Sequence, residues 1–324
     1  MNRLLSSFGI LCLLTLPVVS SAFAQTGNYP DKPVTIISDS AAGSSPDVVA
    51  RFVAEGLGKI WGQQVIVVNR PGANGSIAAH AASEAAADGY TLFHPTLSTF
   101  VALPTIAPNL PVKLPRDFLP IGFSVDQPMF IAVSPSLGVT TLPQLIALAK
   151  KEPEKITIAA TGIGRLTHLT GVLLQDRANI KFVPVPYTRG PASAIGDVAD
   201  GRVSMIIEGY SGIVGAVKAG QVKLIAVGSS ERLPEFPDLP TVAETLPGFR
   251  GSGWQVLVAP VGTPAPIIAK VSADMSKVES DPDFKAKLAS FGNYPRPMTP
   301  EQTLAFVNKE QDTWLPVVQE ISEK

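Results

Sequence analysis

Residues 34–68 read VTIISDSAAGSSPDVVARFVAEGLGKIWGQQVIVV, and they predict a strand, a helix and a second strand in succession. The apolar runs VTII and QVIVV at the two ends are short and rich in β-branched residues, as buried strands are. Between them, residues 47–62 repeat apolar side chains along one broad helical face. An Ala-rich helix over 76–87 and a strand over 90–93 continue the alternation. The stretch therefore predicts a βαβαβ unit with a largely parallel sheet.

A second α/β series follows a proline-rich stretch, 103–120, which we expect to be a long surface connection. The expected strands and helices of this series alternate over 129–133, 141–153, 156–160, 166–178, 182–187, 191–201, 203–207, 211–220, 223–228 and 254–260. After the last strand only helices are expected, at 264–279, 282–290 and 300–322.

The two series predict an α/β fold of two lobes, with the helical C-terminal segment packed back on the first lobe. The first lobe would comprise 25–125 together with 256–324, and the second lobe would comprise 126–255. Open α/β sheets bind ligands at the carboxyl ends of their strands. We therefore expect a ligand cleft between the lobes.

The composition restricts the classes of function. Residues 1–24 combine a basic start, an apolar run too short to span a bilayer, and AFA at 22–24, which predicts a signal peptide cleaved after Ala24. The single Cys, Cys12, lies in that segment, so the exported chain would contain no disulfide, thiolate nucleophile or Cys-ligated metal. With 26 basic and 27 acidic residues and no basic stripe, nucleic acid is not an expected partner.

Four loops rich in small residues each lie between an expected strand and an expected helix. They are 38–46, 71–76, 160–169 and 187–197. Small side chains let a ligand approach backbone N–H groups, and a helix start adds a partial positive charge. Any one of them could be an ordinary capped loop. Because all four would face the same crevice, we expect an anion site there, and a carboxylate as its ligand.

Several side chains near these loops have two interpretations each. Arg165 and Arg189 could each clamp a carboxylate bidentately, or could be solvated at loop edges. His168, in the first turn of a helix, could donate to an anion or be a satisfied, partly buried group. Glu208 ends the expected strand 203–207, and it could accept a hydrogen bond from a ligand hydroxyl or from a neighbouring N–H group.

Enzyme signatures are absent from the sequence. The three His residues (80, 94 and 168) have no metal-ligand spacing, and there is no G-x-S-x-G or P-loop. Gly162-x-Gly164 lacks the third glycine of a dinucleotide loop. The sequence therefore predicts no catalytic residue, metal or cofactor, although an exported hydrolase that uses carboxylates alone is left open.

Six strings of the sequence together resemble the Bug family, the periplasmic solute receptors of tripartite tricarboxylate transporters. They are YPDKPVTII, VVNRPGANGSIAAHAASEAAADGYTL, TGIGRLTHL, VPYTRGPASAIGDVADGRVSMII, VKAGQVKLIAVGSSERLPEFPDLPTVAETLPGF and WQVLVAPVGTPAPII, and the likeness spans about 29–322. The resemblance implies a two-lobed type II periplasmic binding protein fold that closes on one small organic anion. It also implies a periplasmic location, a monomer, and the inner-membrane permease subunits of the transporter as partners.

In the Bug family, the ligand carboxylate is held by the loop after the first strand and by the Gly-rich loop of the second lobe, partly through ordered waters. These loops correspond to 38–45 and 161–165, and the 187–191 loop joins them. The candidate ligand-binding residues are Ser38, Ala41, Ala42, Gly43, Ser44, Ser45, Asp47, Ser98, Thr161, Gly162, Ile163, Gly164, Arg165, His168, Tyr187, Arg189, Gly190 and Glu208.

The sequence departs from the family pattern at three places. The first loop reads SDSAAGSSPD where P-x-x-P-G-G-x-x-D is usual, Arg165 stands where a small polar residue is usual, and position 208 is Glu rather than Asp. With Arg165 and Arg189 as two cationic groups, we hypothesise a dicarboxylate ligand, and an aromatic acid such as a phthalate isomer fits the same hypothesis. A module that presents a ligand-dependent surface to a signalling protein would share this fold and pocket, and stays open as an alternative.

Overall fold

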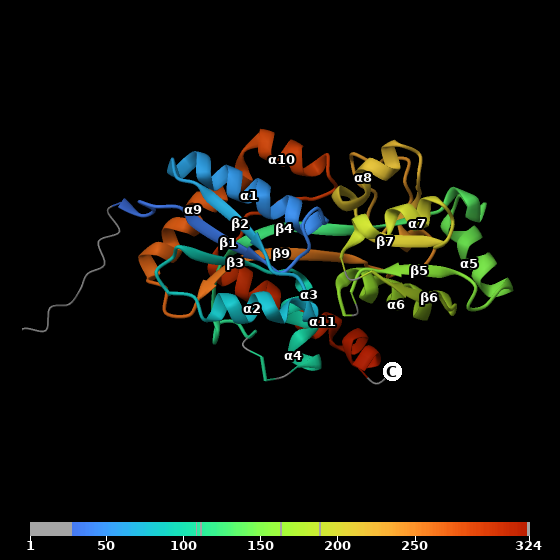
Figure 1. Ribbon diagram of the computed structural model, residues 1–324, viewed down its shortest axis with the longest axis horizontal. Helices are drawn as coiled ribbons and strands as arrows, with labels where there is room; N and C mark the ends of the chain where they lie inside the picture. The colour runs from blue at the N-terminus through green and yellow to red at the C-terminus, as the bar shows by residue number, and fades with distance from the viewer. Residues whose placement is uncertain (1–27, 108, 111, 163, 188, 323–324) are drawn as a thin grey trace, which may run out of the picture.

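The computed structural model describes residues 28–107, 109–110, 112–162, 164–187 and 189–322. It shows a mixed α/β protein whose helices surround strands that run along the long axis of the molecule (Figure 1). The predicted signal peptide and the candidate residue Ile163 lie outside the described residues.

The first elements follow the predicted βαβαβ order. They are β1 (Val34–Ser38), α1 (Ser45–Trp61), β2 (Val65–Asn69), α2 (Ser76–Ser83) and β3 (Thr91–His94). β1 lies between β2 and β3 and pairs with both in parallel. Because these three strands run the same way, the loops that follow them gather at one edge of the sheet.

The segment between β3 and the second series differs from the prediction. It contains two short helices, α3 (Leu97–Val101) and α4 (Leu103–Ile106), and then a sixteen-residue strand, β4 (Phe118–Val133). Leu103, Val112 and Phe118 are buried, so the predicted surface connection over 103–120 is wrong at these positions. Prolines are uncommon inside strands, so the sequence pattern did not predict β4 here. The structure accommodates Pro120 because it lies where the register of β4 shifts, and such irregularities tolerate proline inside a sheet.

The second series matches the prediction closely. It consists of α5 (Leu142–Lys151), β5 (Thr157–Ala160), α6 (Leu166–Ala178), β6 (Val183–Pro186), α7 (Ile195–Ala199), β7 (Met205–Gly209), α8 (Tyr210–Lys218) and β8 (Lys223–Val227). β5 lies between β6 and β7 and is parallel to both. The loops after these strands therefore also gather at one edge.

The last elements are the strand β9 (Ser252–Pro260) and three helices, as predicted. The helices are α9 (Ala265–Ser280), α10 (Pro282–Ala289) and α11 (Pro300–Ser322). Every residue of β9 is buried, which explains why its sequence is a continuous apolar run rather than an alternation. α11 packs against α3, α4 and β4, and also against α6.

β4 and β9 connect the two lobes, which we call the first lobe (the side of β1–β3) and the second lobe (the side of β5–β8). The strand order is β2-β1-β3-β9-β4-β7-β5-β6, and β8 pairs with β4 off this path. The first part of β4 pairs antiparallel with β9, and residues 129–133 pair with β7 and β8. In Figure 1 both strands run lengthwise through the middle of the molecule. The lobe boundaries placed after residues 125 and 255 fall inside these two strands.

Candidate functional site

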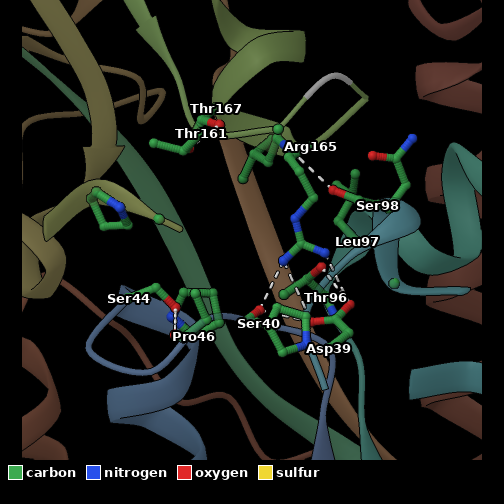
Figure 2. A pocket seen from close by; sticks show the side chains of 18 of the residues that line it. Asp39, Ser40, Ser44, Pro46, Thr96, Leu97, Ser98, Thr161, Arg165 and Thr167 are labelled. Atoms are coloured by element: carbon green, nitrogen blue, oxygen red, sulfur yellow. Dashed lines mark hydrogen bonds and ion pairs between the residues drawn. The ribbon is translucent and has the colours of Figure 1, made fainter. Parts of the chain in front are cut away.

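A cavity of about 200 Å³ lies where the loops of the two lobes meet. Each of the four small-residue loops contributes to its wall, together with α3, β4, β7 and β9. Figure 2 shows the parts of the wall formed by Asp39–Pro46, Thr96–Ser98, Thr161 and Arg165–Thr167. The lining residues are Asp39, Ser40, Ala41, Ser44, Pro46, Pro71, Gly72, Ala73, Asn74, Gly75, Thr96, Leu97, Ser98, Gln127, Met129, Thr161, Gly162, Arg165, Leu166, Thr167, Gly190, Pro191, Glu208 and Trp254.

The predicted ligand-binding residues divide into two groups by their position relative to this cavity. Those that line it are Ala41, Ser44, Ser98, Thr161, Gly162, Arg165, Gly190 and Glu208. Those outside its lining are Ser38, Ala42, Gly43, Ser45, Asp47, Gly164, His168, Tyr187 and Arg189. Of the two arginines, Arg165 lines the cavity, whereas Arg189 is exposed and outside the lining.

Arg165 reaches across the cavity from the second lobe to the first. It precedes α6 as the N-cap residue, and Figure 2 shows its side chain extending toward Ser40 and Asp39. Nη2 donates to the Ser40 hydroxyl at 2.8 Å, and Nη1 lies 3.3 Å from Oδ2 of Asp39. The side chain is only 17% exposed, and Nη1 has no hydrogen-bond partner among the described residues. Nη1 is therefore held by its ion pair with Asp39 and makes no hydrogen bond within the described residues.

Asp39 fixes the position of this guanidinium. Its buried carboxylate accepts hydrogen bonds from the Thr96 backbone N–H at 3.1 Å, the Thr96 hydroxyl at 3.0 Å, the Thr99 hydroxyl at 2.6 Å and the Ser40 hydroxyl at 2.7 Å. Burial raises the pKa of Asp39, but the charge of Arg165 and these hydrogen bonds outweigh it, so the pKa lies below its usual value. Asp39 is therefore ionised and neutralises much of the Arg165 charge.

Two further hydrogen bonds join the lobes beside the cavity. The backbone N–H of Leu166, at the start of α6, donates to the Ser98 hydroxyl of α3 at 3.0 Å. The hydroxyl of Ser211 on α8 donates to the hydroxyl of Ser45 in the first turn of α1. Together with the Arg165–Asp39 pair, these bonds hold the lobes against each other around the cavity.

Several predicted residues outside the lining stabilise the loops instead. Asp47 accepts from the Gly43 backbone N–H at 2.9 Å and from the Asn69 amide at 2.8 Å, which holds the loop after β1. Nδ1 of His168 accepts from the Gly164 backbone N–H at 3.3 Å, and burial lowers the pKa of His168, so the imidazole is neutral. The Tyr187 hydroxyl donates to Asp197. These contacts give the loops their shape.

Glu208 is a buried acid in the cavity wall. It ends β7, is 4% exposed, and its Oε1 accepts from the Gly209 backbone N–H at 3.0 Å. Burial raises the pKa of Glu208 to about 7, against smaller lowering contributions from the Gly209 N–H group and the Arg165 charge. A large share of Glu208 is therefore neutral at neutral pH.

Gln127 is a lining residue that the sequence did not reveal. It lies in β4 and is 3% exposed, and its Oε1 accepts from Nε2 of Gln255 at 3.1 Å. Its own Nε2 has no hydrogen-bond partner among the described residues. Asp39 and Ser40 lie in the predicted loop 38–45 but were not among the candidate residues, and Thr96 and the apolar wall were missed. For Asp39 a signal existed, because it is an acid placed in a loop otherwise made of small residues directly after a strand.

The described part of the chain contains no group of three or more His, Cys, Asp or Glu residues that could hold a metal ion. Within the same residues, no helix is long and apolar enough to cross a membrane.

Comparison with known proteins adds independent evidence. Residues 49–322 match the profile of the tripartite tricarboxylate transporter family receptor, TctC. Protein BugT of Bordetella pertussis is 33% identical over 326 residues, covering 100% of this chain and 99% of BugT. Among solved structures, an R. palustris protein with adipate has a TM-score of 0.86 at 28% identity, over 90% of this chain and 98% of that one. MatC from Rhodopseudomonas palustris with bound malate has a TM-score of 0.81 at 30% identity, over 90% of this chain and 100% of that one.

These matches confirm the family and the two-lobed periplasmic binding protein fold that the sequence predicted. The relatives with solved structures are binding proteins, some of them with ligands bound, rather than enzymes. The chain therefore belongs to the TctC family of tripartite tricarboxylate transporter receptors, and it is a periplasmic solute-binding receptor of the TctC/Bug type.

Proposed function

We propose that this receptor captures a small dicarboxylate in the cavity between its lobes and delivers it to the membrane subunits of a tripartite tricarboxylate transporter. The observation that carries the proposal is the Arg165 guanidinium, which lines the cavity and whose Nη1 makes an ion pair with Asp39 but no hydrogen bond within the described residues. A carboxylate oxygen would accept from this nitrogen in a charge-assisted hydrogen bond.

Helix starts at the cavity support an anionic ligand. Leu166 and Thr167 begin α6, and Pro46 lies in the first turn of α1, and all three line the cavity. The N-terminus of a helix carries roughly half a positive charge, so both helices favour a carboxylate there.

The size and apolar wall of the cavity favour a short carbon chain between the polar groups. Its volume of about 200 Å³ is smaller than the roughly 300–1,000 Å³ of drug-sized pockets. Leu97, Met129, Leu166 and Trp254 supply apolar surface. Two related structures contain adipate and malate, which are both dicarboxylates.

A binding titration tests the proposal. The chain from residue 25 to 324 would be titrated by calorimetry with succinate, malate, adipate, terephthalate and hexanoate, and the bound acid recovered for mass analysis. We expect one dicarboxylate per chain, returned chemically unchanged. Failure of all five acids to bind would contradict the proposal, and a chemically altered acid would show an enzyme instead. The signal peptide is tested separately, since the chain from a periplasmic extract should begin at Gln25.

Closure of the lobes can be tested without touching the cavity's charged groups. Gly209 has ordinary backbone angles, but a Cβ there would lie 2.5 Å from the Ser45 hydroxyl and 2.7 Å from Nε2 of Gln127. Gly209→Ala should therefore wedge the lobes apart and weaken dicarboxylate binding tenfold or more in calorimetry. Gly215→Ala is the matched control on α8, because a Cβ there meets nothing within 4 Å. Equal affinities of the two variants would show that the lobes need not close this tightly.

A further inference from the structure

We propose that Gln127 and Glu208 bind the second carboxylate of the ligand, and that Glu208 does so as the neutral acid, so that the receptor takes up one proton with each dicarboxylate. This inference rests on the proposed dicarboxylate and specifies how its second carboxylate is held. Gln127 and Glu208 come from β4 and β7, which are neighbouring antiparallel strands, and both side chains line the cavity.

The unpaired donor of Gln127 indicates what kind of ligand group belongs beside it. Its buried Nε2 has no partner among the described residues, and a buried donor left unpaired costs roughly 1–3 kcal/mol. A carboxylate oxygen would pair with it, whereas an ammonium group could not, because an ammonium is only a donor. The second carboxylate of a dicarboxylate is therefore the group that fits.

Glu208 can accompany a carboxylate only in its neutral form. Two buried carboxylates side by side repel each other, so one of them holds a proton. Oε1 of Glu208 already accepts from the Gly209 N–H, which leaves the other oxygen to carry the proton and donate it to the ligand. About half of Glu208 is already neutral near pH 7, because burial raises its pKa to about 7.

The surroundings of Glu208 include four charged or titratable side chains and one helix end. Arg165 at the start of α6 favours its ionised form, although Asp39 neutralises much of that charge. The first turn of α1, which carries Asp47, lies near Glu208. Gly212 lets α8 pack closely against both this turn and Glu208, because a Cβ there would lie 3.0 Å from Cγ of Glu208 and 3.4 Å from the Ser45 nitrogen. Tyr210 on α8 has its pKa raised by burial and stays neutral below pH 10.

His168 and Asp39 titrate below the range from pH 6.5 to 9. Burial lowers the pKa of His168 below its usual 6.5, and the pKa of Asp39 lies below 3.8. Glu208, with a pKa raised to about 7, lines the cavity and changes its charge within this range. The carboxylic acids of the panel are ionised throughout it, since such groups have a pKa of about 4.

The expected effect follows from the fraction of Glu208 that is neutral. Above a pKa of about 7 this fraction falls tenfold per pH unit, and the apparent affinity falls with it. Dicarboxylate affinity should therefore drop roughly a hundredfold between pH 6 and pH 9. At pH 8, about one proton should be taken up for each dicarboxylate bound.

The test is a calorimetric titration with adipate, or with whichever panel dicarboxylate binds most tightly, at pH 6, 7, 8 and 9. At pH 8 it is repeated in phosphate and in Tris, since the difference in measured enthalpy counts the protons taken up. Glu208→Gln keeps a donor but cannot titrate, so its affinity should vary less than threefold over this range. Glu279→Gln is the control, because Glu279 is also a buried acid but lies in α9, outside the cavity lining. Hexanoate, which lacks the second carboxylate, should bind without proton uptake.

The outcomes separate this inference from the proposed function. A dicarboxylate that binds the wild-type chain with the same affinity at every pH and without proton uptake would overturn the inference and leave the proposed function standing. A Glu208→Gln chain that melts normally but keeps the wild-type pH profile would overturn it too, because another group would then carry the proton. Absence of binding by every acid at pH 6 would overturn both.

Discussion

Replacing Arg165 with alanine is expected to reduce dicarboxylate affinity at least a hundredfold, whereas Arg189→Ala should leave it within twofold. Arg165 borders the cavity, and each charge-assisted hydrogen bond that its guanidinium makes to a carboxylate is worth about 1.5–3 kcal/mol. Arg189 has the same side chain on a neighbouring loop but is exposed and outside the cavity lining. Calorimetry on both variants measures the difference.

Arg165→Ala should also destabilise the protein. It leaves the buried carboxylate of Asp39 without its cation, and breaking one partner of a buried ion pair typically costs about 3–5 kcal/mol. The double variant Arg165→Ala with Asp39→Asn removes that unpaired charge, so its melting temperature should recover while its affinity does not. If the double variant regained affinity, Asp39 would be obstructing the ligand rather than positioning Arg165. Comparable losses in Arg165→Ala and Arg189→Ala would contradict the assignment of Arg165.

Replacing Glu279 with glutamine is expected to stabilise the protein at neutral and alkaline pH. Glu279 is 2% exposed, its Oε1 has no hydrogen-bond partner among the described residues, and burial raises its pKa to about 9. The folded chain therefore holds a proton there that the unfolded chain, with a pKa near 4.5, releases. Below pH 4.5 the folded and unfolded chains both hold this proton, so Glu279 does not lower the stability of the fold. As the pH rises from 4.5 to about 9, the fold progressively loses stability.

The size of this effect is large for a single side chain. One pH unit corresponds to about 1.4 kcal/mol for such a group, so at pH 7 roughly 3 kcal/mol of stability is lost. Glu279→Gln should therefore raise the melting temperature by several degrees at pH 8 and by little at pH 4.5. Glu231→Gln, at an exposed position, is the control and should change neither value. A Glu279→Gln chain that melts at the wild-type temperature at pH 8 would show that Glu279 is not destabilising.

The convergence of the four small-residue loops could be predicted because parallel strands fix the direction in which their loops point. Residues 38–46, 71–76, 160–169 and 187–197 all contribute to the cavity wall. Local patterns were sufficient here, since each loop lies between a short apolar strand and a helix start. Local patterns also predicted the three C-terminal helices to within one residue at each end.

Contacts between the lobes could not be predicted from local patterns. The partner of Arg165 is Asp39, which is 126 positions away in the chain and in the other lobe. Whether a loop arginine enters the cavity also depends on the loop's own backbone, which turned Arg165 inward and left Arg189 exposed. Gln127 lies in the part of β4 that the sequence pattern did not predict as a strand, so the Gln127 side chain was not expected at the cavity.

The pairing of β4 with β9 has a consequence for the order in which the chain folds. Phe118 pairs with Pro260, roughly 140 residues later, and the whole second lobe lies between them. Pairings across such a distance form slowly, because a long loop must close before they contribute. The first lobe therefore lacks β9, the strand that joins β3 to β4, until most of the chain has been made. A chain whose first lobe cannot complete its sheet until late folds slowly. Slow folding favours export in the unfolded state, which the predicted signal peptide implies.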